Sequence, residues 1–310
     1  MAILVDIHSQ DWMSEEDFKK EIAGLVNEDV RFYPHIGDSG DIKMLATDHL
    51  RPGLVARLPG LELIQKLGAG VDTMVSDPEL PFHVRITRIK HTTTAMEMAR
   101  FCLAYVLQDV QNMIFHREKQ NQASWQPVAP KRVADLTVGV LGLGHIGGTA
   151  ARLFHCAGFN VVGWSRSQKS IDGIRCVSGD EGLQDLLFSS DYVASILPST
   201  PQTENLFNLE KFKLMKPGCM LINVGRGSLI VEEDLVTALD QGCLAHAVLD
   251  VCQQEPLPEE NPMWLHPGIT ITPHISGWDL DDGLSVVTDN YFRLIEGREL
   301  LHEIDRNSGY

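Results

Sequence analysis

The feature that most constrains how this chain folds is a glycine motif near its middle. The apolar run Leu136-Thr-Val-Gly-Val-Leu141 leads directly into Gly142-Leu-Gly-His-Ile-Gly147, and an apolar helical pattern follows. A G-x-G-x-x-G motif between a strand and a helix lets backbone approach a pyrophosphate, which the helix amides and dipole attract. The motif alone also fits a tight strand–helix turn without a ligand. Its position after a strand and before a helix favours a dinucleotide-binding domain.

Segments typical of strands and helices alternate on both sides of this motif. Helices are expected from Ser14, as a cap, to about residue 26, then over about 93–120 and about 283–296. The expected strands are at 3–7, 30–33, 43–47, 61–66, 84–88, 136–142, 160–164, 191–197, 220–223, 247–251 and 269–272. Such alternation with short connections predicts parallel sheets that helices cover on both faces.

The alternation divides the chain into two regions. We therefore predict an α/β protein with two doubly wound parallel-sheet domains. A Rossmann cofactor domain at 98–283 is inserted in a discontinuous, flavodoxin-like substrate domain that comprises 1–97 and 284–310.

Charge and composition exclude several classes of partner. Lys and Arg number 26 against 42 Asp and Glu, a net charge of −16, and a negative field of this size repels nucleic acid and anionic membranes. No apolar run approaches the roughly 18 residues that span a bilayer, and Met1–Asp6 is typical of a first strand rather than a signal peptide. The six cysteines form no C-x-x-C pair or metal-ligand cluster. We expect mostly buried, reduced thiols, no metal, and a cytoplasmic protein.

The turn after strand 160–164 indicates which nicotinamide cofactor the domain binds. An acidic residue there usually binds the ribose 2′-hydroxyl of NAD, but the sequence is Ser165-Arg166-Ser167, and no acid occurs between Gly147 and Asp172. A guanidinium group matches the oxygens of a 2′-phosphate. The alternative is a solvated basic turn. The composition of the turn favours NADPH over NADH.

Three polar residues follow later strands in an order that suits a reduction. Arg226 lies just past strand 220–223, Glu255 follows strand 247–251, and His274 follows strand 269–272. An arginine can bind a carboxylate and polarise a ketone, while a histidinium donates a proton and a nearby carboxylate keeps it charged and oriented. Each residue alone could be a turn or surface residue. Their joint placement at strand ends predicts the reduction of a 2-oxo acid to a 2-hydroxy acid.

At this point the sequence resembles the D-isomer-specific 2-hydroxyacid dehydrogenases over nearly its whole length. The shared motifs are the glycine motif, Leu197-Pro-Ser-Thr-Pro-Gln-Thr203, Asn223-Val-Gly-Arg-Gly227, Leu249-Asp-Val251, Glu255-Pro256 and Pro273-His274. Further segments resemble the glyoxylate/hydroxypyruvate reductase A subgroup, among them Leu67-Gly-Ala-Gly-Val-Asp72, Ser124-Trp-Gln-Pro127 and Asp305-Arg-Asn-Ser-Gly-Tyr310. One departure is Arg100, at a position where many members carry Glu.

The resemblance implies a role for particular residues. It implies an Arg226, Glu255 and His274 catalytic trio, and a substrate held by Arg226, His274 and the backbone amides of Ala69 and Gly70. It also implies a hinge and a homodimer built mainly through the cofactor domains. The residues expected to bind the cofactor are Gly142, Gly144, His145, Ile146, Gly147, Ser165, Arg166, Ser167, Leu197, Pro198, Thr203, Val224, Gly225, Asp250, Ser276 and Gly277.

Two other functions fit the same fold. One is a non-catalytic protein that senses NAD(P), although such a protein should lack one of the trio. The other is the same chemistry on a bulkier 2-oxo acid, because the sequence does not fix the shape of the substrate pocket.

Overall fold

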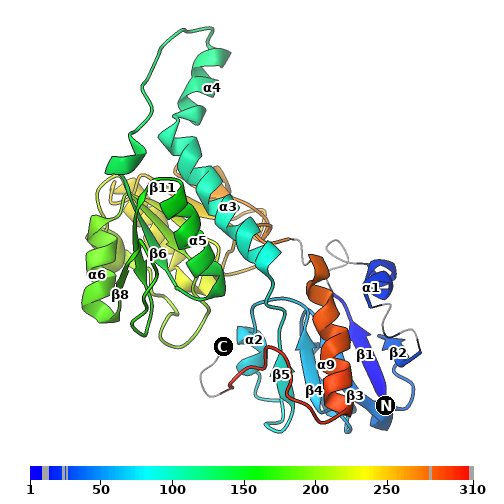
Figure 1. Ribbon diagram of the computed structural model, residues 1–310. Helices are drawn as coiled ribbons and strands as arrows, with labels where there is room; N and C mark the ends of the chain where they lie inside the picture. The colour runs from blue at the N-terminus through cyan, green and yellow to red at the C-terminus, as the bar shows by residue number, and fades with distance from the viewer. Residues whose placement is uncertain (9–13, 23–24, 26, 279–280, 307–310) are drawn as a thin grey trace. The chain divides into compact units, whose positions relative to one another are not determined.

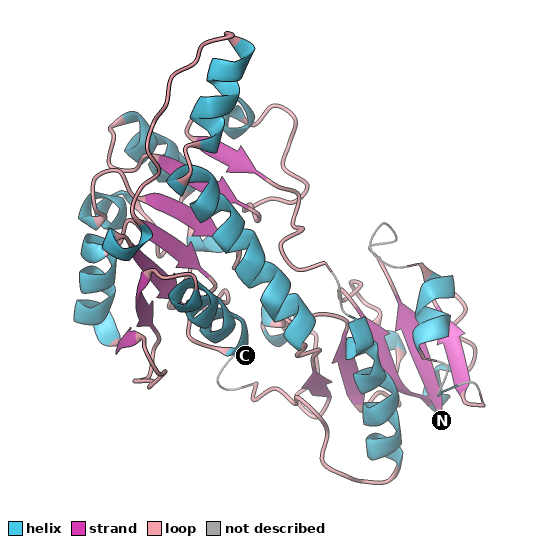
Figure 2. Ribbon diagram, turned by 45° about the horizontal axis from the view of Figure 1, so that its top comes forward, coloured by secondary structure: helices cyan, strands magenta, loops and turns pink. Residues whose placement is uncertain are grey.

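The computed structural model describes residues 1–8, 14–22, 25, 27–278 and 281–306. The chain divides into two compact units. We call Met1–Thr93 with Asp279–Tyr310 the outer unit and Thr94–Trp278 the inner unit. Each unit is built on one parallel sheet with helices packed on it (Figures 1 and 2). The predicted fold class is confirmed.

The outer unit contains a five-stranded sheet in the order β2-β1-β3-β4-β5, with all strand pairs parallel. This order is that of flavodoxin-like folds. Its strands are β1 (Ala2–Asp6), β2 (Asp29–Phe32), β3 (Ile42–Thr47), β4 (Leu63–Lys66) and β5 (Arg85–Thr87). Its helices are α1 (Glu15–Glu21), α2 (Asp72–Val75) and α9 (Ser285–Ile295), with the 3-10 turns η2 (Ser39–Asp41), η3 (Val55–Arg57) and η7 (Asp281–Leu284).

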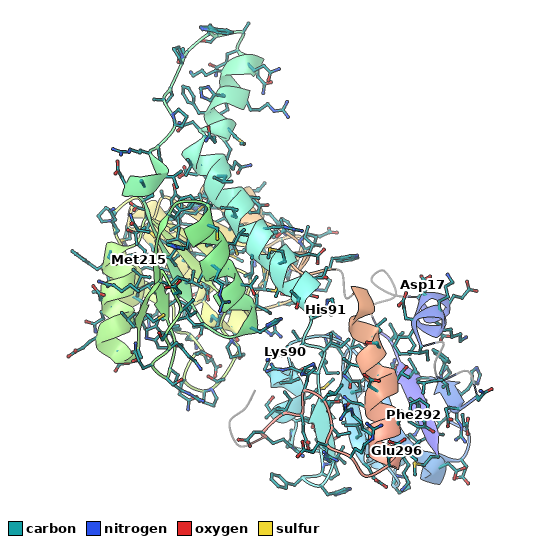
Figure 3. All side chains as sticks on the ribbon, in the orientation of Figure 1. Asp17, Lys90, His91, Met215, Phe292 and Glu296 are labelled. Carbon is teal, nitrogen blue, oxygen red and sulfur yellow. The ribbon has the colours of Figure 1, made fainter. Side chains whose placement is uncertain are left out.

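Both faces of the outer sheet are covered, because alternate side chains of each strand point to opposite faces. One face packs against η3 and α2, and the other against α1 and α9. Figure 3 labels Phe292, which packs against the second cluster, and Glu296 at the end of α9. Buried Asn290 of α9 donates to Oε1 of Gln65 at 2.8 Å. The last helix therefore completes a core that the first residues begin.

The inner unit contains a seven-stranded parallel sheet in the order β12-β11-β10-β9-β6-β7-β8, which is a Rossmann order with one added strand. Its strands are β6 (Thr137–Leu141), β7 (Asn160–Trp164), β8 (Arg175–Val177), β9 (Tyr192–Ser195), β10 (Met220–Asn223), β11 (His246–Leu249) and β12 (Ile269–Ile271).

Helices cover both faces of this sheet as well. One cluster joins α3 and α5 to the sheet, and the other joins α6, α7 and α8 to the opposite face. The helices are α3 (Thr92–Val110), α4 (Met113–Asn121), α5 (His145–Cys156), α6 (Gly179–Ser189), α7 (Leu209–Leu214) and α8 (Glu232–Asp240), with η4 (Val133–Asp135), η5 (Gly227–Leu229) and η6 (Pro262–Leu265).

The structure corrects two expected elements. The single helix expected over about 93–120 is broken, because Asn112 adopts a left-handed conformation (φ 53°) between α3 and α4, a conformation that Asn tolerates better than most residues. Figure 1 shows α4 and the segment after it projecting from the inner unit. The helix capped by Ser14 ends at Glu21, and residues 23–24 and 26 of the expected span lie outside the described residues. The short strand β8 was not predicted.

The structure tests two expectations, the burial of the cysteines and the absence of a helix that spans a membrane. All six cysteines are free, but only Cys102, Cys219 and Cys252 are buried, and Cys156 is exposed, so the expectation that most are buried is wrong. None of the described helices combines the length and apolar character that crossing a bilayer requires.

Candidate active site

The predicted residues of the inner unit gather at one edge because neighbouring strands end in register. Leu141 pairs with Ser195, Ser195 with Asn223, and Asn223 with Leu249. Leu249 pairs in turn with Ile271. The segments that follow these strands are the glycine motif, the Leu197–Thr203 loop, the Arg226 turn, the Asp250–Glu255 loop and the His274 loop. They therefore leave the same carboxyl edge, where parallel sheets bind ligands.

The three glycines of the motif differ in what surrounds them. Gly142 has φ +98°, a conformation that favours glycine. A Cβ at Gly147 would lie 1.7 Å from the carbonyl oxygen of Gly142, so only glycine lets α5 pack this close to β6. A Cβ at Gly144, the N-cap of α5, would meet nothing within 4 Å. The motif thus leaves open space beside the first amides of α5, at His145 and Ile146, which fits a dinucleotide pyrophosphate.

The turn after β7 presents its basic side chains to solvent. Ser165 is buried, and its hydroxyl donates to the carbonyl of Ser167 at 2.8 Å, which shapes the turn. Arg166, Ser167 and Lys169 are exposed. Arg166 and Ser167 are thus accessible to the 2′-phosphate of NADP, while Ser165 supports the turn from beneath.

Two further cofactor-site loops pack on each other. Thr203 holds the loop after β9, because its hydroxyl donates to the carbonyl of Pro198 at 2.7 Å and accepts from the Thr200 amide at 2.8 Å. A Cβ at Gly225, next to buried Val224, would lie 2.5 Å from the carbonyl oxygen of Leu197. The loops after β9 and β10 are therefore in backbone contact.

Arg226 is positioned by the end of its own strand. The buried Asn223 side chain donates to the Arg226 carbonyl at 2.9 Å and accepts from the Gly225 amide at 3.2 Å. A Cβ at Gly227 would lie 1.9 Å from the Cys252 carbonyl oxygen. The arginine turn therefore packs directly on the loop that leads to Glu255.

His274 and Glu255 form a hydrogen-bonded pair. Nδ1 of His274 lies 2.7 Å from Oε2 of Glu255, and the Cys252 amide donates to Oε1 at 3.0 Å. Burial opposes ionisation of Glu255, but the hydrogen bond and charge of His274, the Cys252 amide and the charge of Arg226 together lower the pKa of this carboxyl. The carboxylate is thus kept ionised beside the imidazole, and among the described residues the second ring nitrogen, Nε2, has no hydrogen-bond partner.

Asp250 fixes the loop that carries His274. Its carboxylate is 1 % exposed. It accepts from the Thr272 hydroxyl at 2.6 Å and from the amides of Ile275 and Ser276, each at 2.9 Å. The amide of His274 donates to the Asp250 carbonyl at 2.9 Å. A Cβ at Gly277 would lie 2.8 Å from Thr94 of α3. The observed contacts of Asp250 are therefore structural, and the cofactor contact that the resemblance implies stays a prediction.

One buried residue of this edge was missed. Ser195 ends β9, is fully buried, and its hydroxyl has no hydrogen-bond partner among the described residues. Buried hydroxyl groups usually have a hydrogen-bond partner in proteins, so this serine stands out at the carboxyl edge. No signal in the sequence distinguished this serine from others.

The outer unit carries the other predicted residues. Ala69 and Gly70 lie in the turn between β4 and α2 and are partly exposed. Arg100, the departure noted in the sequence, is exposed on α3, and nothing in the structure explains it.

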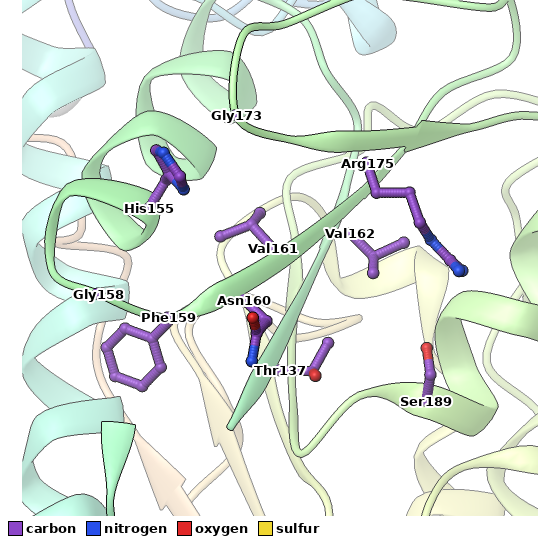
Figure 4. Close-up of a pocket in the computed structure, with 10 residues that line it drawn as sticks. All are labelled: Thr137, His155, Gly158, Phe159, Asn160, Val161, Val162, Gly173, Arg175 and Ser189. Carbon is purple, nitrogen blue, oxygen red and sulfur yellow. The ribbon is translucent and has the colours of Figure 1, made fainter. Parts of the chain in front are cut away.

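The structure shows a surface pocket away from the carboxyl edge and, among the described residues, no metal site. A surface pocket of about 570 Å³ lies at the opposite end of the inner sheet, where Thr137 begins β6 and Asn160 begins β7 (Figure 4). It contains none of the predicted site residues. Within the described part of the chain, no group of three or more His, Cys, Asp or Glu side chains could hold a metal ion.

The sequence matches a family model and curated relatives. Residues 103–276 match the model of the D-isomer specific 2-hydroxyacid dehydrogenase, NAD binding domain. The glyoxylate/hydroxypyruvate reductase A of Serratia proteamaculans is 36% identical over 263 residues, which cover 83% of this chain and 84% of the relative. That of Photorhabdus laumondii is 35% identical with the same coverage.

Solved structures are similar over the whole chain. A D-isomer specific 2-hydroxyacid dehydrogenase from Xanthobacter autotrophicus Py2, in complex with NADPH and MES, has a TM-score of 0.89 at 33% identity and covers 99% of both chains. An NADPH-dependent glyoxylate/hydroxypyruvate reductase from Sinorhizobium meliloti, in complex with NADP and sulfate, has a TM-score of 0.91 at 29% identity. It covers 100% of this chain and 99% of its own.

Proposed function

The chain belongs to the D-isomer specific 2-hydroxyacid dehydrogenase family, and we propose that it is an NADPH-dependent reductase of small 2-oxo acids. The observation that carries the proposal is the 2.7 Å pair of His274 and Glu255, at the edge that also carries Arg226 and the glycine motif. The names of the relatives and the cofactors in the solved structures support both the substrate class and NADPH.

Each group of the site has a distinct role in the proposed reduction of the ketone. NADPH, when bound, supplies the hydride that the ketone carbon accepts. Arg226 binds the substrate carboxylate and polarises the ketone oxygen. His274 donates a proton to that oxygen, and Glu255 holds the imidazole in place and stabilises its charged form. The amides of Ala69 and Gly70 provide further donors for the carboxylate.

The cofactor would be held by the open space at Gly144 and by the turn at Arg166. The turn has no acidic residue to bind a ribose 2′-hydroxyl and offers an exposed guanidinium instead. This difference favours NADPH over NADH.

We further propose a homodimer in the cytoplasm. The projecting segment formed by α4 and the following loop exposes Met113, Ile114, Trp125 and Val128, with Trp125 97% exposed. Clustered apolar exposure of this kind marks interaction surfaces, and we assign this one to a second copy of the chain. Six free cysteines suit a reducing compartment.

A steady-state screen tests the function. The purified protein is given glyoxylate, hydroxypyruvate and bulkier 2-oxo acids such as phenylpyruvate, each with NADPH and with NADH. We expect the highest kcat/KM for a small 2-oxo acid with NADPH. Turnover of none of them, together with tight NADPH binding, would instead indicate a cofactor-sensing protein. A preference for phenylpyruvate would refute the small substrate.

A further inference from the structure

The turn after β4 in the outer unit is tied to the end of β5 by two consecutive carbonyl groups. The Gly68 carbonyl accepts from the Ile89 amide at 3.0 Å. The Ala69 carbonyl accepts from Nη1 of Arg88 at 3.3 Å. Both donors belong to the residues that follow β5, so both carbonyls point toward groups of that segment.

Peptide planarity then fixes where the next two amides point. In a trans peptide the C=O and the following N–H point in opposite directions. The amides of Ala69 and Gly70 therefore face away from the Ile89 amide and the Arg88 guanidinium, respectively. Among the residues that the structure describes, no acceptor is bonded to either amide, and both residues are partly exposed. Two adjacent, outward N–H groups form a concavity suited to an anion.

Arg88 is a cation of the outer unit that contacts this loop. It is half-buried, and no acidic side chain among the described residues pairs with it. In contrast, Arg51 lies 3.0 Å from Asp6, and Arg85 of β5 lies 2.6 Å from Glu303. Burial lowers the pKa of Arg88, so the charge is held here against a desolvation cost. Among the described residues, the hydrogen bond that its side chain donates goes to the Ala69 carbonyl, while its backbone amide donates to the His302 carbonyl at 3.3 Å.

We propose that Arg88 is a positioning residue for substrate binding: it holds the Ala69–Gly70 peptide so that the two loop amides receive the carboxylate of the 2-oxo acid. A cation bonded to a carbonyl also polarises the peptide, which makes the N–H at its other end a stronger donor. This inference rests on the proposed function, and it adds a residue that contacts the loop rather than the substrate.

Kinetics of Arg88 variants test the inference. For Arg88→Gln we expect a KM for glyoxylate about 10- to 100-fold higher, because a charge-assisted hydrogen bond is lost. The dissociation constant of NADPH should stay within about twofold, since the cofactor residues lie in the inner unit. Arg88→Lys should recover part of the lost affinity. Arg85→Gln is the matched control, because it removes the same charge three positions earlier, in β5, from a side chain that bonds to Glu303 and not to the loop. It should leave KM unchanged.

A binding measurement separates this role from a merely structural one. With alanine and glycine labelled with ¹⁵N, sodium oxamate (an unreactive isostere of a 2-oxo acid) should shift the amide signals of Ala69 and Gly70 in the wild-type protein with NADP present. The shifts should require about 10- to 100-fold more oxamate in Arg88→Gln. If that variant does not fold, Arg88→Lys provides the same comparison with a smaller expected change.

The outcomes are distinguishable from failure of the proposed function. Wild-type amide shifts that require more oxamate in Arg88→Gln, without turnover of any 2-oxo acid by the wild type, would support the role of Arg88 in anion binding while refuting the reductase. An unchanged KM in a folded Arg88→Gln variant, an equal effect of Arg85→Gln, or wild-type amides that do not respond to oxamate would overturn the role of Arg88.

Discussion

His274 and Glu255 meet at 2.7 Å although 19 positions separate them in the chain. The two side chains come from the loops after adjacent strands β11 and β12, and they are 54% and 39% exposed. The pair is therefore positioned by the sheet and still open to a ligand.

Replacing His274 should remove the proton donor and spare the cofactor site. We expect His274→Ala to lower kcat by about 10²- to 10⁴-fold, the usual contribution of general acid catalysis, with an unchanged dissociation constant for NADPH. The matched control is His266→Ala, because His266 also faces a carboxylate of the inner unit, Asp240, at 3.4 Å. Normal turnover in His274→Ala would refute the assignment.

The ionisation of Glu255 should be visible in both rate and stability. Glu255→Gln should lower kcat by about 10²-fold or more, because a neutral amide cannot stabilise a charged imidazole. The pKa of Glu255 is below its ordinary value of 4.5. Its stabilising effect is therefore present above about pH 4.5 and is lost as the pH falls through the lowered pKa. The melting temperatures of the wild type and of Glu255→Gln should differ most above pH 4.5 and converge in acid. A constant difference across this range would contradict the role of the carboxylate.

The second and third glycines of the motif should respond differently to alanine. Gly147→Ala places a Cβ 1.7 Å from the Gly142 carbonyl oxygen, and such overpacking should destabilise the inner unit by about 1–3 kcal/mol. Gly144→Ala meets nothing in the protein, so its melting temperature should match the wild type. NADPH should nevertheless bind Gly144→Ala about 10-fold or more weakly, because the methyl group occupies the space of the pyrophosphate. Calorimetry gives the melting temperature and the dissociation constant of NADPH. Full NADPH affinity in Gly144→Ala would place the pyrophosphate elsewhere.

The cofactor preference should depend on Arg166. Arg166→Asp removes a charge-assisted contact to the 2′-phosphate and adds a repulsive charge, so NADPH should lose about 10- to 100-fold in kcat/KM relative to NADH. Arg132→Asp makes the same charge change at a position that is 80% exposed in the inner unit and should leave the ratio as it is. The ratio of kcat/KM for the two cofactors is the measurement, and no change in Arg166→Asp would refute its role.

The exposed tryptophan of the projecting segment should control assembly. We expect Trp125→Asp to convert the dimer into monomers, because a charge would have to be buried in the interface. Phe188→Asp alters another exposed aromatic residue, 74% exposed on α6, and should stay dimeric. Sedimentation or light scattering gives the mass. A wild-type monomer would overturn the proposed homodimer.

Strand ends were the part of the site that sequence could predict. The residues after β6, β10 and β12 follow apolar runs that are easily recognised. Gly142, Arg226 and His274 could therefore be assigned to the carboxyl edge of one sheet from the sequence alone. The break at Asn112 could not be predicted, because a single left-handed residue interrupts an otherwise continuous helical pattern. The expected cofactor contact of Asp250 remains a prediction, and its bonds to residues 22 to 26 positions later are visible only in three dimensions.

The proposed role of Arg88 also could not be predicted from the sequence. Its partner, the Ala69 carbonyl, lies 19 positions away. Every residue has a backbone carbonyl, so the residue type at position 69 does not reveal this contact. Sequence patterns identify groups that carry chemistry, but they do not identify a side chain whose task is to hold a peptide in one orientation.

Because a chain is synthesised from its N-terminal side, the outer unit can be completed only after the inner unit has been made. Buried Asn290 and Tyr291 of α9 bond to Gln65 and Glu28, which are synthesised more than 200 residues earlier. The inner unit is one continuous stretch and can fold as it emerges. A nascent chain that stops before α9 would thus already carry the glycine motif and the His274–Glu255 pair, yet have no finished core behind the Ala69–Gly70 loop. Premature termination should produce a protein that captures NADPH and cannot use it.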